Sequence, residues 1–320
     1  MSRFFIGIVG NRICRRFSRR FLKGYVMKTV RIASFLTVVL CAVVAWSSRV
    51  QADDSCEFRV MSFNIRCATG ADGDNNWEFR RETLLDVIKE NDPLLLGLQE
   101  ALPVQMEYLK ENLTDYQAIG VGRDDGKEKG EVMAIFFKKD MVELLDSGTF
   151  WLSKTPDEPS KGWDAQCFRT VTWGKFKCKK TGKTFCYANT HLDHVGTIAR
   201  KEGAKLILRR MSKVADGSDP FFVSGDFNVS DQHDAYISIT EGVDDIPGLR
   251  DANKVAKERE AAQEYTYHNW DKIPADKGEI IDFIFVNDKV DVKKFKINPV
   301  RHSNGRCASD HVSIVATIAI

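Results

Sequence analysis

The chain has 320 residues, a formal net charge of +2 and 43% hydrophobic residues, with 22 glycines and 8 prolines. These values are typical of a folded globular protein, and they exclude a disulfide miniprotein, a disordered chain and a polytopic membrane protein. The charge is uneven, because residues 1–52 contain ten Lys or Arg and no Asp or Glu. The remainder holds 37 basic and 45 acidic residues, a net charge of −8, which argues against a general nucleic-acid binder.

Residues 1–52 are predicted to be an N-terminal extension and secretory signal peptide. After Met27, two basic residues precede the fifteen-residue apolar run 32–46, and a small-residue site ends at Ala52. This pattern predicts cleavage after Ala52 and export to the periplasm or the exterior. The run is shorter than the roughly 20 residues of a membrane-spanning helix, so no stable span is expected in the mature protein; a retained anchor is the alternative.

Export would expose the cysteines to oxidising conditions. Cys178 and Cys186 flank a turn-like Lys-Thr-Gly-Lys sequence, so a cross-strand disulfide between them is one expectation, and two unbridged strand residues are the other. No cysteine pair after residue 52 has the CxxC spacing of a zinc site.

Apolar periodicity predicts alternating strands and helices from residue 58 onwards. The predicted helices are Trp77–Asn91, Val104–Leu113 and Thr197–Val214. The predicted strands are Phe58–Ile65, Leu94–Leu98, Tyr116–Val121, Glu131–Phe137, Met141–Trp151, Phe168–Cys178, Phe185–His191, Phe221–Ser224, Glu264–His268, Ile280–Val286, Val290–Ile297 and Val312–Ile320. No repeat or linker interrupts residues 55–320, so they are predicted to form a single α+β domain in which two sheets pack between helices.

Polar side chains recur at the ends of the apolar strands. They comprise four carboxylates, two amides and two histidines: Glu100, Asp226, Asp282, Asp310, Asn64, Asn228, His191 and His311. Asp282 stands out, because strand alternation places it on the same face as Ile280, Ile284 and Val286. A lone carboxylate there would be poorly solvated unless it had a partner.

Each of these residues has a structural alternative, such as a helix cap, a turn or a hydrogen-bonded core histidine. Together they supply oxygen ligands for a Mg²⁺-like ion and an imidazole–carboxylate pair for proton transfer. That combination of groups is what metal-assisted hydrolysis of a phosphoester requires.

Six motifs in the chain resemble, in the same order, those of the endonuclease/exonuclease/phosphatase superfamily. They are Ser62-Phe63-Asn64-Ile65, Leu98-Gln99-Glu100, Asn189-Thr190-His191-Leu192-Asp193-His194, Gly225-Asp226-Phe227-Asn228, Ile281-Asp282-Phe283-Ile284-Phe285-Val286 and Ser309-Asp310-His311. The resemblance implies a four-layer α/β/β/α sandwich of two packed mixed β-sheets flanked by helices. Two further stretches, residues 150–153 and 161–164, are similar to exported bacterial members of unassigned substrate.

The resemblance also implies a metal site. Glu100 would bind the divalent cation with Asn64 and Asp310 near it. Mg²⁺ is the expected ion and Mn²⁺ the alternative, since both accept a few oxygen ligands and retain water.

The catalytic roles follow from the same resemblance. Asp226 would orient or deprotonate the attacking water, and Asn228 would hold water or a phosphate oxygen. His311, braced by Asp282, would be either the general base or a protonated stabiliser of the transition state. His191 would donate to a phosphate oxygen.

Two arginines are candidate phosphate contacts, with a surface ion pair as the alternative for each. Arg66 replaces the acid that many nuclease members have two residues beyond the first-motif asparagine, which disfavours a second metal. Arg169 stands where related exported proteins have an arginine.

The expected substrate is a small or terminal phosphoester, such as a lipid headgroup, a sugar phosphate or a nucleotide. An extracellular nuclease acting on DNA or RNA is the first alternative. A secreted binding module without catalytic activity is the second.

Overall fold

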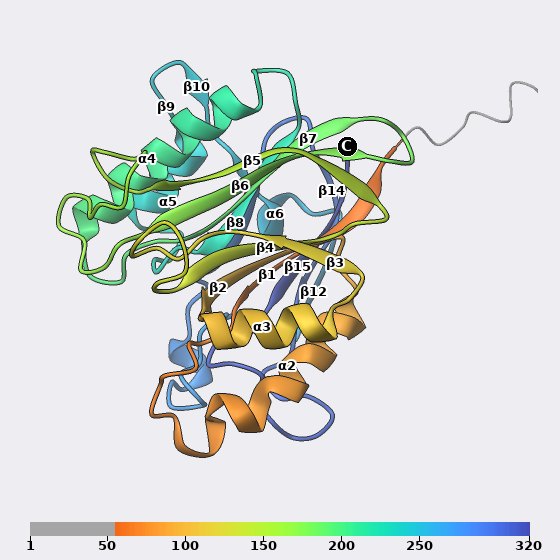
Figure 1. Cartoon of the computed structure of the whole chain (residues 1–320), viewed down its shortest axis with the longest axis vertical. Coiled ribbons are helices and arrows are strands. Elements are labelled where there is room, and N and C mark those ends of the chain that lie inside the picture. The colour runs from red at the N-terminus through yellow and green to blue at the C-terminus, as the bar shows by residue number, and fades with distance from the viewer. Residues whose placement is uncertain (1–54) are drawn as a thin grey trace, which may run out of the picture. The chain divides into compact units, whose positions relative to one another are not determined.

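Two β-sheets packed face to face between two pairs of helices make up residues 55–320, which are the residues that the computed structural model describes (Figure 1). These residues form one compact unit, Ser55–Ile320. The predictions for residues 1–52 lie outside the described part of the chain.

The first sheet has seven strands in the order β12-β14-β15-β1-β2-β4-β3. Its strands are β1 (Glu57–Asn64), β2 (Leu95–Ala101), β3 (Tyr116–Ile119), β4 (Val132–Lys138), β12 (Glu258–Ala261), β14 (Asp291–Ile297) and β15 (Ile314–Ala319). The sheet is mixed, because β1 pairs with β2 in parallel and with β15 in antiparallel orientation.

The second sheet has six strands in the order β11-β13-β8-β7-β6-β5. Its strands are β5 (Val142–Trp151), β6 (Thr170–Cys178), β7 (Thr184–His191), β8 (Phe221–Asp226), β11 (Arg250–Asp251) and β13 (Asp282–Val286). Here β7 and β8 are parallel and the other pairs are antiparallel. The two-residue strands β9 (Gly242–Val243) and β10 (Ile246–Pro247) form a separate small sheet.

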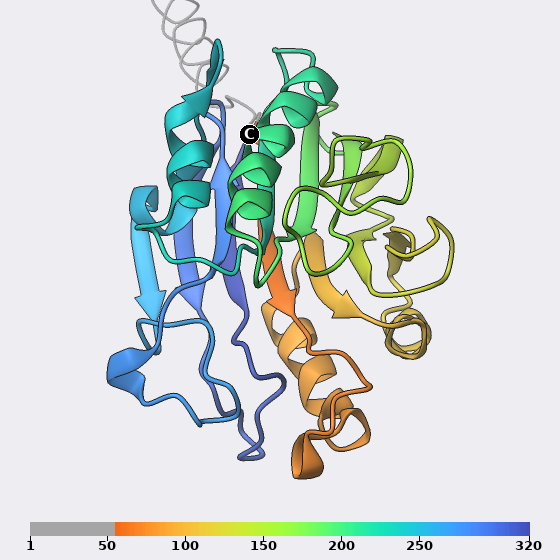
Figure 2. The same ribbon diagram turned by 90° about the vertical axis from the view of Figure 1, so that its left-hand side faces the viewer.

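Helices cover the outer face of each sheet. The helices are α2 (Trp77–Asn91), α3 (Pro103–Asn112), α4 (Thr197–Val214), α5 (Asp234–Glu241) and the short α6 (Ala252–Val255), and η1 (Gly73–Asn75) and η2 (Ala275–Lys277) are single 3₁₀ turns. Apolar residues of α2 and α3 pack on the seven-stranded sheet, and those of α4 and α5 on the six-stranded sheet (Figures 1 and 2). The predicted four-layer α/β/β/α sandwich is confirmed.

Side-chain alternation along the strands divides the apolar residues among three cores. In β1, Phe58 and Val60 belong to the core between the sheets, whereas Met61 and Phe63 face α2 and α3. A strand buried on both faces reads as a nearly continuous apolar run, which explains why the central strands were recognisable from the sequence.

The predicted helices Trp77–Asn91 and Thr197–Val214 have the bounds found in the structure. The predicted strand Glu264–His268 is wrong, because only Tyr267 forms a bridge there, to His311. The backbone N–H of Thr266 donates to the carbonyl of Glu279, and the N–H of Val312 donates to the carbonyl of Thr266. The segment is therefore held between two separate parts of the chain instead of along one neighbouring strand.

The disulfide joins Cys56 to Cys178, across a sequence separation of 122, and not Cys178 to Cys186. Cys178 faces the core between the sheets, whereas Cys186 faces the core beneath α4. The strand register explains the difference: the N–H of Cys178 binds the carbonyl of Lys183, three residues before Cys186, so the two side chains point to opposite faces. Cys186 is a free, buried thiol.

Among the described residues, none of the helices is long and apolar enough to cross a membrane.

Candidate active site

The polar strand-end residues converge at one edge of the sandwich, where the two sheets meet. Asn64 and Glu100 come from β1 and β2 of the seven-stranded sheet, and Asp310 and His311 from the loop before β15. His191, Asp226 and Asp282 come from β7, β8 and β13 of the six-stranded sheet, and Asn228 follows β8. Asp226 is the register partner of both His191 and Asp282, so the six-stranded sheet aligns its three groups side by side.

Asn64 lies at the centre of this edge and is fully buried. Its Nδ2 lies 3.0 Å from Oε1 of Glu100 and 2.9 Å from Oδ2 of Asp226, so it connects the two sheets. Its Oδ1 accepts the backbone N–H of Arg66 at 3.0 Å. In this arrangement the amide nitrogen faces the carboxylates, and the amide would have to rotate before its oxygen could bind an ion at Glu100.

Glu100 reaches the site because β2 is irregular at this residue. Its φ of 62° is left-handed, and the pairing of β2 with β4 shifts register between Leu98 and Ala101. Bulges of this kind redirect a side chain that regular alternation would point elsewhere. Burial raises the pKa of Glu100, but hydrogen bonds from Asn64 and from the backbone of Cys67 outweigh burial and lower that pKa.

The same turn follows β1 and β8. The side-chain oxygen of Asp226 accepts the backbone N–H of Asn228 at 2.8 Å, as Asn64 does for Arg66. The third residue of each turn is left-handed, with φ of 53° at Arg66 and 52° at Asn228. Asx turns of this type satisfy a backbone donor locally and hold the strand-end side chain in one orientation.

His311 and Asp282 form a buried imidazole–carboxylate pair. Nδ1 of His311 lies 2.9 Å from Oδ2 of Asp282, and its Nε2 lies 3.4 Å from Nδ2 of Asn64 and 3.6 Å from Oδ2 of Asp226. Burial alone would lower the pKa of His311, but the carboxylates of Asp282 and Asp226 outweigh burial and raise it. Burial also raises the pKa of Asp226, and the charge of Asp282 adds to that rise although His311 opposes it.

His191 lies on the other side of Asp226. Its Nε2 is 2.9 Å from Nδ2 of Asn228 and 3.4 Å from Oδ2 of Asp226. Burial lowers the pKa of His191, and the positive charge of Arg169 lowers it further, which favours the neutral imidazole. The site thus has one histidine in an anionic environment and one in a cationic environment.

The donor groups fit a hard divalent cation. Burial raises the pKa of Asp310, and the negative charge of the nearby Glu100 also acts to raise it. Asp310 is buried and Glu100 partly buried, and two such carboxylates that repel each other are stabilised by a shared cation. Carboxylate oxygens are the ligands that Mg²⁺ and Mn²⁺ prefer. The ligand atoms of Asp226, Asp282 and His311 also lie within 4.8 Å of one another, but a hydrogen bond within that group accounts for their proximity.

Both predicted phosphate-binding arginines lie beside the site and are paired with carboxylates. Arg66 donates from Nε to Asp72 at 3.0 Å and lies 3.9 Å from Asp310. Arg169 is buried, and its guanidinium lies 3.4 Å from Asp193 and 3.0 Å from Nδ1 of His194. Phosphate bound by either arginine would therefore share the guanidinium with these carboxylates.

Arg80 supports the site and was not predicted from the sequence. It is 1% exposed, and its guanidinium donates to the carbonyls of Asn75, Ile65, Arg66 and Ala308. It thereby fixes the loop after β1 to the loop that carries Asp310. The one signal available was its position on the buried stripe of the helix Trp77–Asn91, where an arginine needs backbone acceptors.

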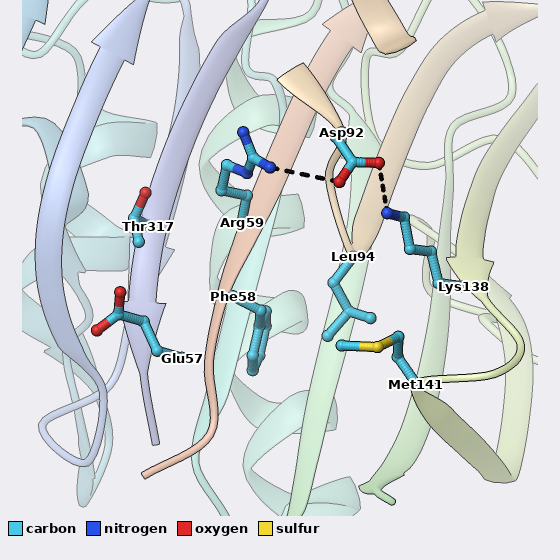
Figure 3. Close-up of a pocket in the computed structure, with 8 residues that line it drawn as sticks. All are labelled: Glu57, Phe58, Arg59, Asp92, Leu94, Lys138, Met141 and Thr317. Atoms are coloured by element: carbon cyan, nitrogen blue, oxygen red, sulfur yellow. Dashed lines mark hydrogen bonds and ion pairs between the residues drawn. The ribbon is translucent and has the colours of Figure 1, made fainter. Parts of the chain in front are cut away.

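A cavity of about 350 Å³ lies away from this site, around the beginning of β1 (Figure 3). Phe58 and Leu94 line its floor, and Asp92 pairs with Arg59 and Lys138 at its rim (Figure 3). Phe58 and Asn64 are six residues apart on β1, about 20 Å in a strand. The cavity is therefore not part of the candidate active site.

Comparisons with known proteins agree with this geometry. A sequence model of the endonuclease/exonuclease/phosphatase family matches residues 61–311. The solved endonuclease/exonuclease/phosphatase from Bacteroides vulgatus is 43% identical, with a TM-score of 0.78 over 82% of this chain and 98% of that chain. The mannosyl-6-phosphatase from Bacteroides thetaiotaomicron is 37% identical, with a TM-score of 0.75 over 82% of this chain and 99% of that chain.

Curated relatives match a smaller part. Nocturnin from Drosophila melanogaster is 25% identical over 60% of this chain and 32% of that protein. An uncharacterized protein of Acanthamoeba polyphaga mimivirus is 25% identical over 49% of this chain and 60% of that protein. The chain therefore spans less than two thirds of the length of either relative. The extent of the family match and the two Bacteroides structures establish that the chain belongs to the endonuclease/exonuclease/phosphatase family of metal-dependent phosphoesterases.

Proposed function

We propose that the protein is an exported, divalent-metal-dependent phosphoesterase that cleaves a P–O bond of a small or terminal phosphoester by in-line attack of an activated water. The observation that carries the proposal is the meeting of Asn64, Asp226 and His311 from two sheets, with their polar atoms 2.9 to 3.6 Å apart. Buried polar groups are unfavourable unless they are paired or used, and such groups cluster at catalytic sites.

Asp226 is the residue best placed to orient and deprotonate water. Its carboxylate is held by Asn64 and by the backbone N–H of Asn228, while His191 and His311 flank it. A carboxylate fixed on several sides can hold a water molecule in one attack direction.

His191 and His311 would act on the phosphate oxygens and the transferred proton. The hydrogen bond from Nδ1 to Asp282 orients His311 so that Nε2 faces Asn64 and Asp226. That orientation supports either proton acceptance from water or donation to a phosphate oxygen. His191 reaches the same region from the opposite side, with Asn228 positioned to hold water or a phosphate oxygen.

Glu100 and Asp310 would hold the divalent cation, with Asn64 joining them after rotation of its amide. When bound, Mg²⁺ or Mn²⁺ would polarise the phosphoryl group and offset its negative charge.

A sugar phosphate is the substrate that the relatives support best, because the Bacteroides thetaiotaomicron mannosyl-6-phosphatase is 37% identical and matches over nearly all of its length. Arg66 and Arg169 would contact the terminal phosphate.

A nuclease is the second candidate, since a relative in Emericella nidulans is a 3'-5'-exoribonuclease subunit and is 29% identical over 42% of this chain. A binding module without catalytic activity is disfavoured, because the residues to which the resemblance assigns catalytic roles, among them Asp226, Asp282 and His311, are all present.

Hydrolysis of p-nitrophenyl phosphate and bis-p-nitrophenyl phosphate tests the proposal. Activity should be lost in EDTA, return with Mg²⁺ or Mn²⁺, and be absent from a His311→Asn variant purified in parallel. Sugar phosphates, phosphoinositides, sphingomyelin, DNA and RNA then rank the substrates. A folded protein that releases no product from any of these with either metal would support the binding module and overturn the proposal.

Export is proposed from the pattern of residues 27–52, and the Cys56–Cys178 disulfide supports it, because structural disulfides persist mainly in oxidising compartments. Fractionation of bacteria expressing the full chain, with N-terminal sequencing of the product, tests it. A periplasmic or secreted protein that begins at Asp53 is expected. An uncleaved cytoplasmic product would overturn the localisation without touching the proposed chemistry.

A further inference from the structure

A small polar cluster lies between the two sheets, directly behind the candidate active site. Nε2 of Gln99 on β2 donates to Oδ1 of Asn189 on β7 at 2.6 Å. Nδ2 of Asn189 donates to the carbonyls of Leu98 and Ala134, at 2.8 and 2.9 Å. Gln99 and Asn189 are both 0% exposed, and their hydrogen bonds run from one sheet to the other through the core.

The strand register places this cluster next to the site on both sheets. Gln99 is the register partner of Asn64 and immediately precedes Glu100. Asn189 lies two residues before His191 and is the partner of Ser224, which lies two residues before Asp226. On the six-stranded sheet, two residues, or about 7 Å, therefore separate Asn189 from His191 and Ser224 from Asp226.

Close approach of the sheets at this level depends on a glycine. A Cβ added to Gly97 would lie 2.3 Å from Oη of Tyr187 and 2.7 Å from Oδ1 of Asn189. A glycine inside a strand marks a point where another part of the structure comes very near. The sheets are thus brought together here, where Asn189 contacts the backbone of both β2 and β4.

Directional bonds at this point have a consequence that apolar packing lacks. Apolar contacts are non-directional, so they hold two sheets together without defining how far one slides along the other. The hydrogen bonds that Asn189 donates to two strand carbonyls, together with the one that it accepts from Gln99, define that offset. The candidate site needs a defined offset, because its central contact, between Asn64 and Asp226, crosses from one sheet to the other at 2.9 Å.

We propose that Gln99 and Asn189 are positioning residues, which fix the register of the two sheets so that Asn64 and Glu100 face Asp226 and His191 in reactive geometry. The proposal rests on the proposed function for its catalytic readout. A displacement of about 1 Å in a catalytic constellation can cost about 100-fold in rate. Neither residue need touch the substrate to have that effect.

Gln99→Met removes one cross-sheet hydrogen bond, the one to Asn189, whereas Asn189→Leu removes all three. Both substitutions change the size of the side chain little. Each should lower kcat on p-nitrophenyl phosphate by about 10- to 100-fold while KM changes less than threefold. The double variant should lose no more than Asn189→Leu alone, because that variant already removes the bond from Gln99.

Tyr187→Phe is the matched control. Tyr187 is also 0% exposed between the sheets, but its hydroxyl bonds Ser224 at 2.6 Å within the six-stranded sheet. The control should lower Tm as the test variants do and keep kcat within about threefold of the wild-type value. Equal losses of kcat in Gln99→Met and Tyr187→Phe would show general destabilisation and overturn the proposal. If either test variant does not fold, Gln99→Asn withdraws the amide by one methylene and gives the same comparison.

Crystal structures of the variants provide a readout independent of activity. The separation of Asn64 Nδ2 and Asp226 Oδ2 should increase from 2.9 Å in Asn189→Leu and stay unchanged in Tyr187→Phe. An unchanged separation in Asn189→Leu would overturn the positioning role even in an active enzyme. If the wild-type protein is inactive and the Asn64–Asp226 separation nevertheless increases in Asn189→Leu, the proposed function is overturned and the positioning role stands.

Discussion

The two ends of the sandwich join the same two sheets in different ways. At the end opposite the candidate site, Cys56 before β1 is linked covalently to Cys178 at the end of β6. At the site end, the sheets meet through hydrogen bonds from Asn64 to Asp226 and between His311 and Asp282. The first joint lies among apolar residues, whereas the second gathers buried ionisable groups. The end with the disulfide is therefore suited to holding the sheets together. The end with the buried ionisable groups is suited to chemistry, and burying those groups lowers the stability of the fold.

Replacing the acid at the centre of the polar joint should have the largest effect. Asp226→Asn keeps the shape of the side chain but removes the proton acceptor, so kcat should fall by about 10²- to 10⁴-fold. Tm should stay the same or rise. Burial, supplemented by the charge of Asp282, raises the pKa of Asp226 in the folded protein, so its ionised form opposes folding at neutral pH.

Steady-state kinetics and thermal unfolding of the same preparation check both parts. A large loss of Tm accompanying the loss of kcat would show that Asp226 is needed mainly for folding, and the contrast between the two ends would fail.

Breaking the covalent joint should give the opposite pattern. Cys178→Ala should lower the free energy of unfolding by about 2–4 kcal/mol, as expected when a long loop is no longer closed. It should leave kcat within about twofold, because Cys178 lies at the far end of β6 from the site. Urea unfolding measured with and without a reductant provides the test.

Cys186→Ala is the control, since Cys186 is buried but unbridged. Its stability should still fall when reductant is added, whereas that of Cys178→Ala should not respond. A reductant-sensitive Cys178→Ala variant would mean that the disulfide pairs other cysteines.

Asp193, beside the site, should give a pH-dependent effect on stability. Burial raises its pKa, but backbone N–H donors from Gly196, Gln166 and Cys167 outweigh burial and hold that pKa well below its usual range. A lowered folded-state pKa stabilises the protein above the unfolded-state value of about 3.9, and the stabilisation is lost as the pH falls towards the folded-state pKa.

Asp193→Asn should therefore reduce the free energy of unfolding by about 1–3 kcal/mol at pH 7, because the amide replaces one carboxylate oxygen by an NH2 group. That group cannot accept the hydrogen bonds that Cys167 and Arg169 donate to Oδ2. The difference from wild type should shrink below about pH 4. Chemical unfolding at pH 7 and pH 3 measures it, and a difference that grows at low pH would show that the charge of Asp193 is not what stabilises this loop.

The sequence predicted the layers well because their information is local. Alternation in β1 and the stripe of Leu84, Leu85 and Ile88 in α2 directly reflect which face each residue buries. The convergence of Asn64, Asp226 and Asp282 was foreseen from the strand-end pattern and the family resemblance. The order of the strands in the two sheets brings these residues together, and the residue pattern within a single strand does not predict that order.

The disulfide and the segment around Thr266 could not be predicted for the same reason. Cys56 and Cys178 are 122 residues apart, and only the packing of the two sheets brings them together. Thr266 has the β-branched character of a strand residue, yet its backbone bonds to Glu279 and Val312, which belong to different segments. Tertiary contacts decided both outcomes against the local signal.

The bulge at Glu100 allows the finest test of the contrast between the two ends. A left-handed conformation costs a residue with a Cβ about 1–2 kcal/mol, and Glu100 adopts one with φ of 62° to face the site. Both Glu100→Ala and Glu100→Gly remove the carboxylate and should abolish metal-dependent activity. The glycine variant should nevertheless unfold with a free energy about 1 kcal/mol higher than the alanine variant, because glycine tolerates this φ. Equal stabilities in urea would mean that β2 relaxes once the carboxylate is gone. The conformation at residue 100 would then be imposed by the contacts of the Glu100 side chain with Asn64 and Cys67, and not by the fold of the sheet.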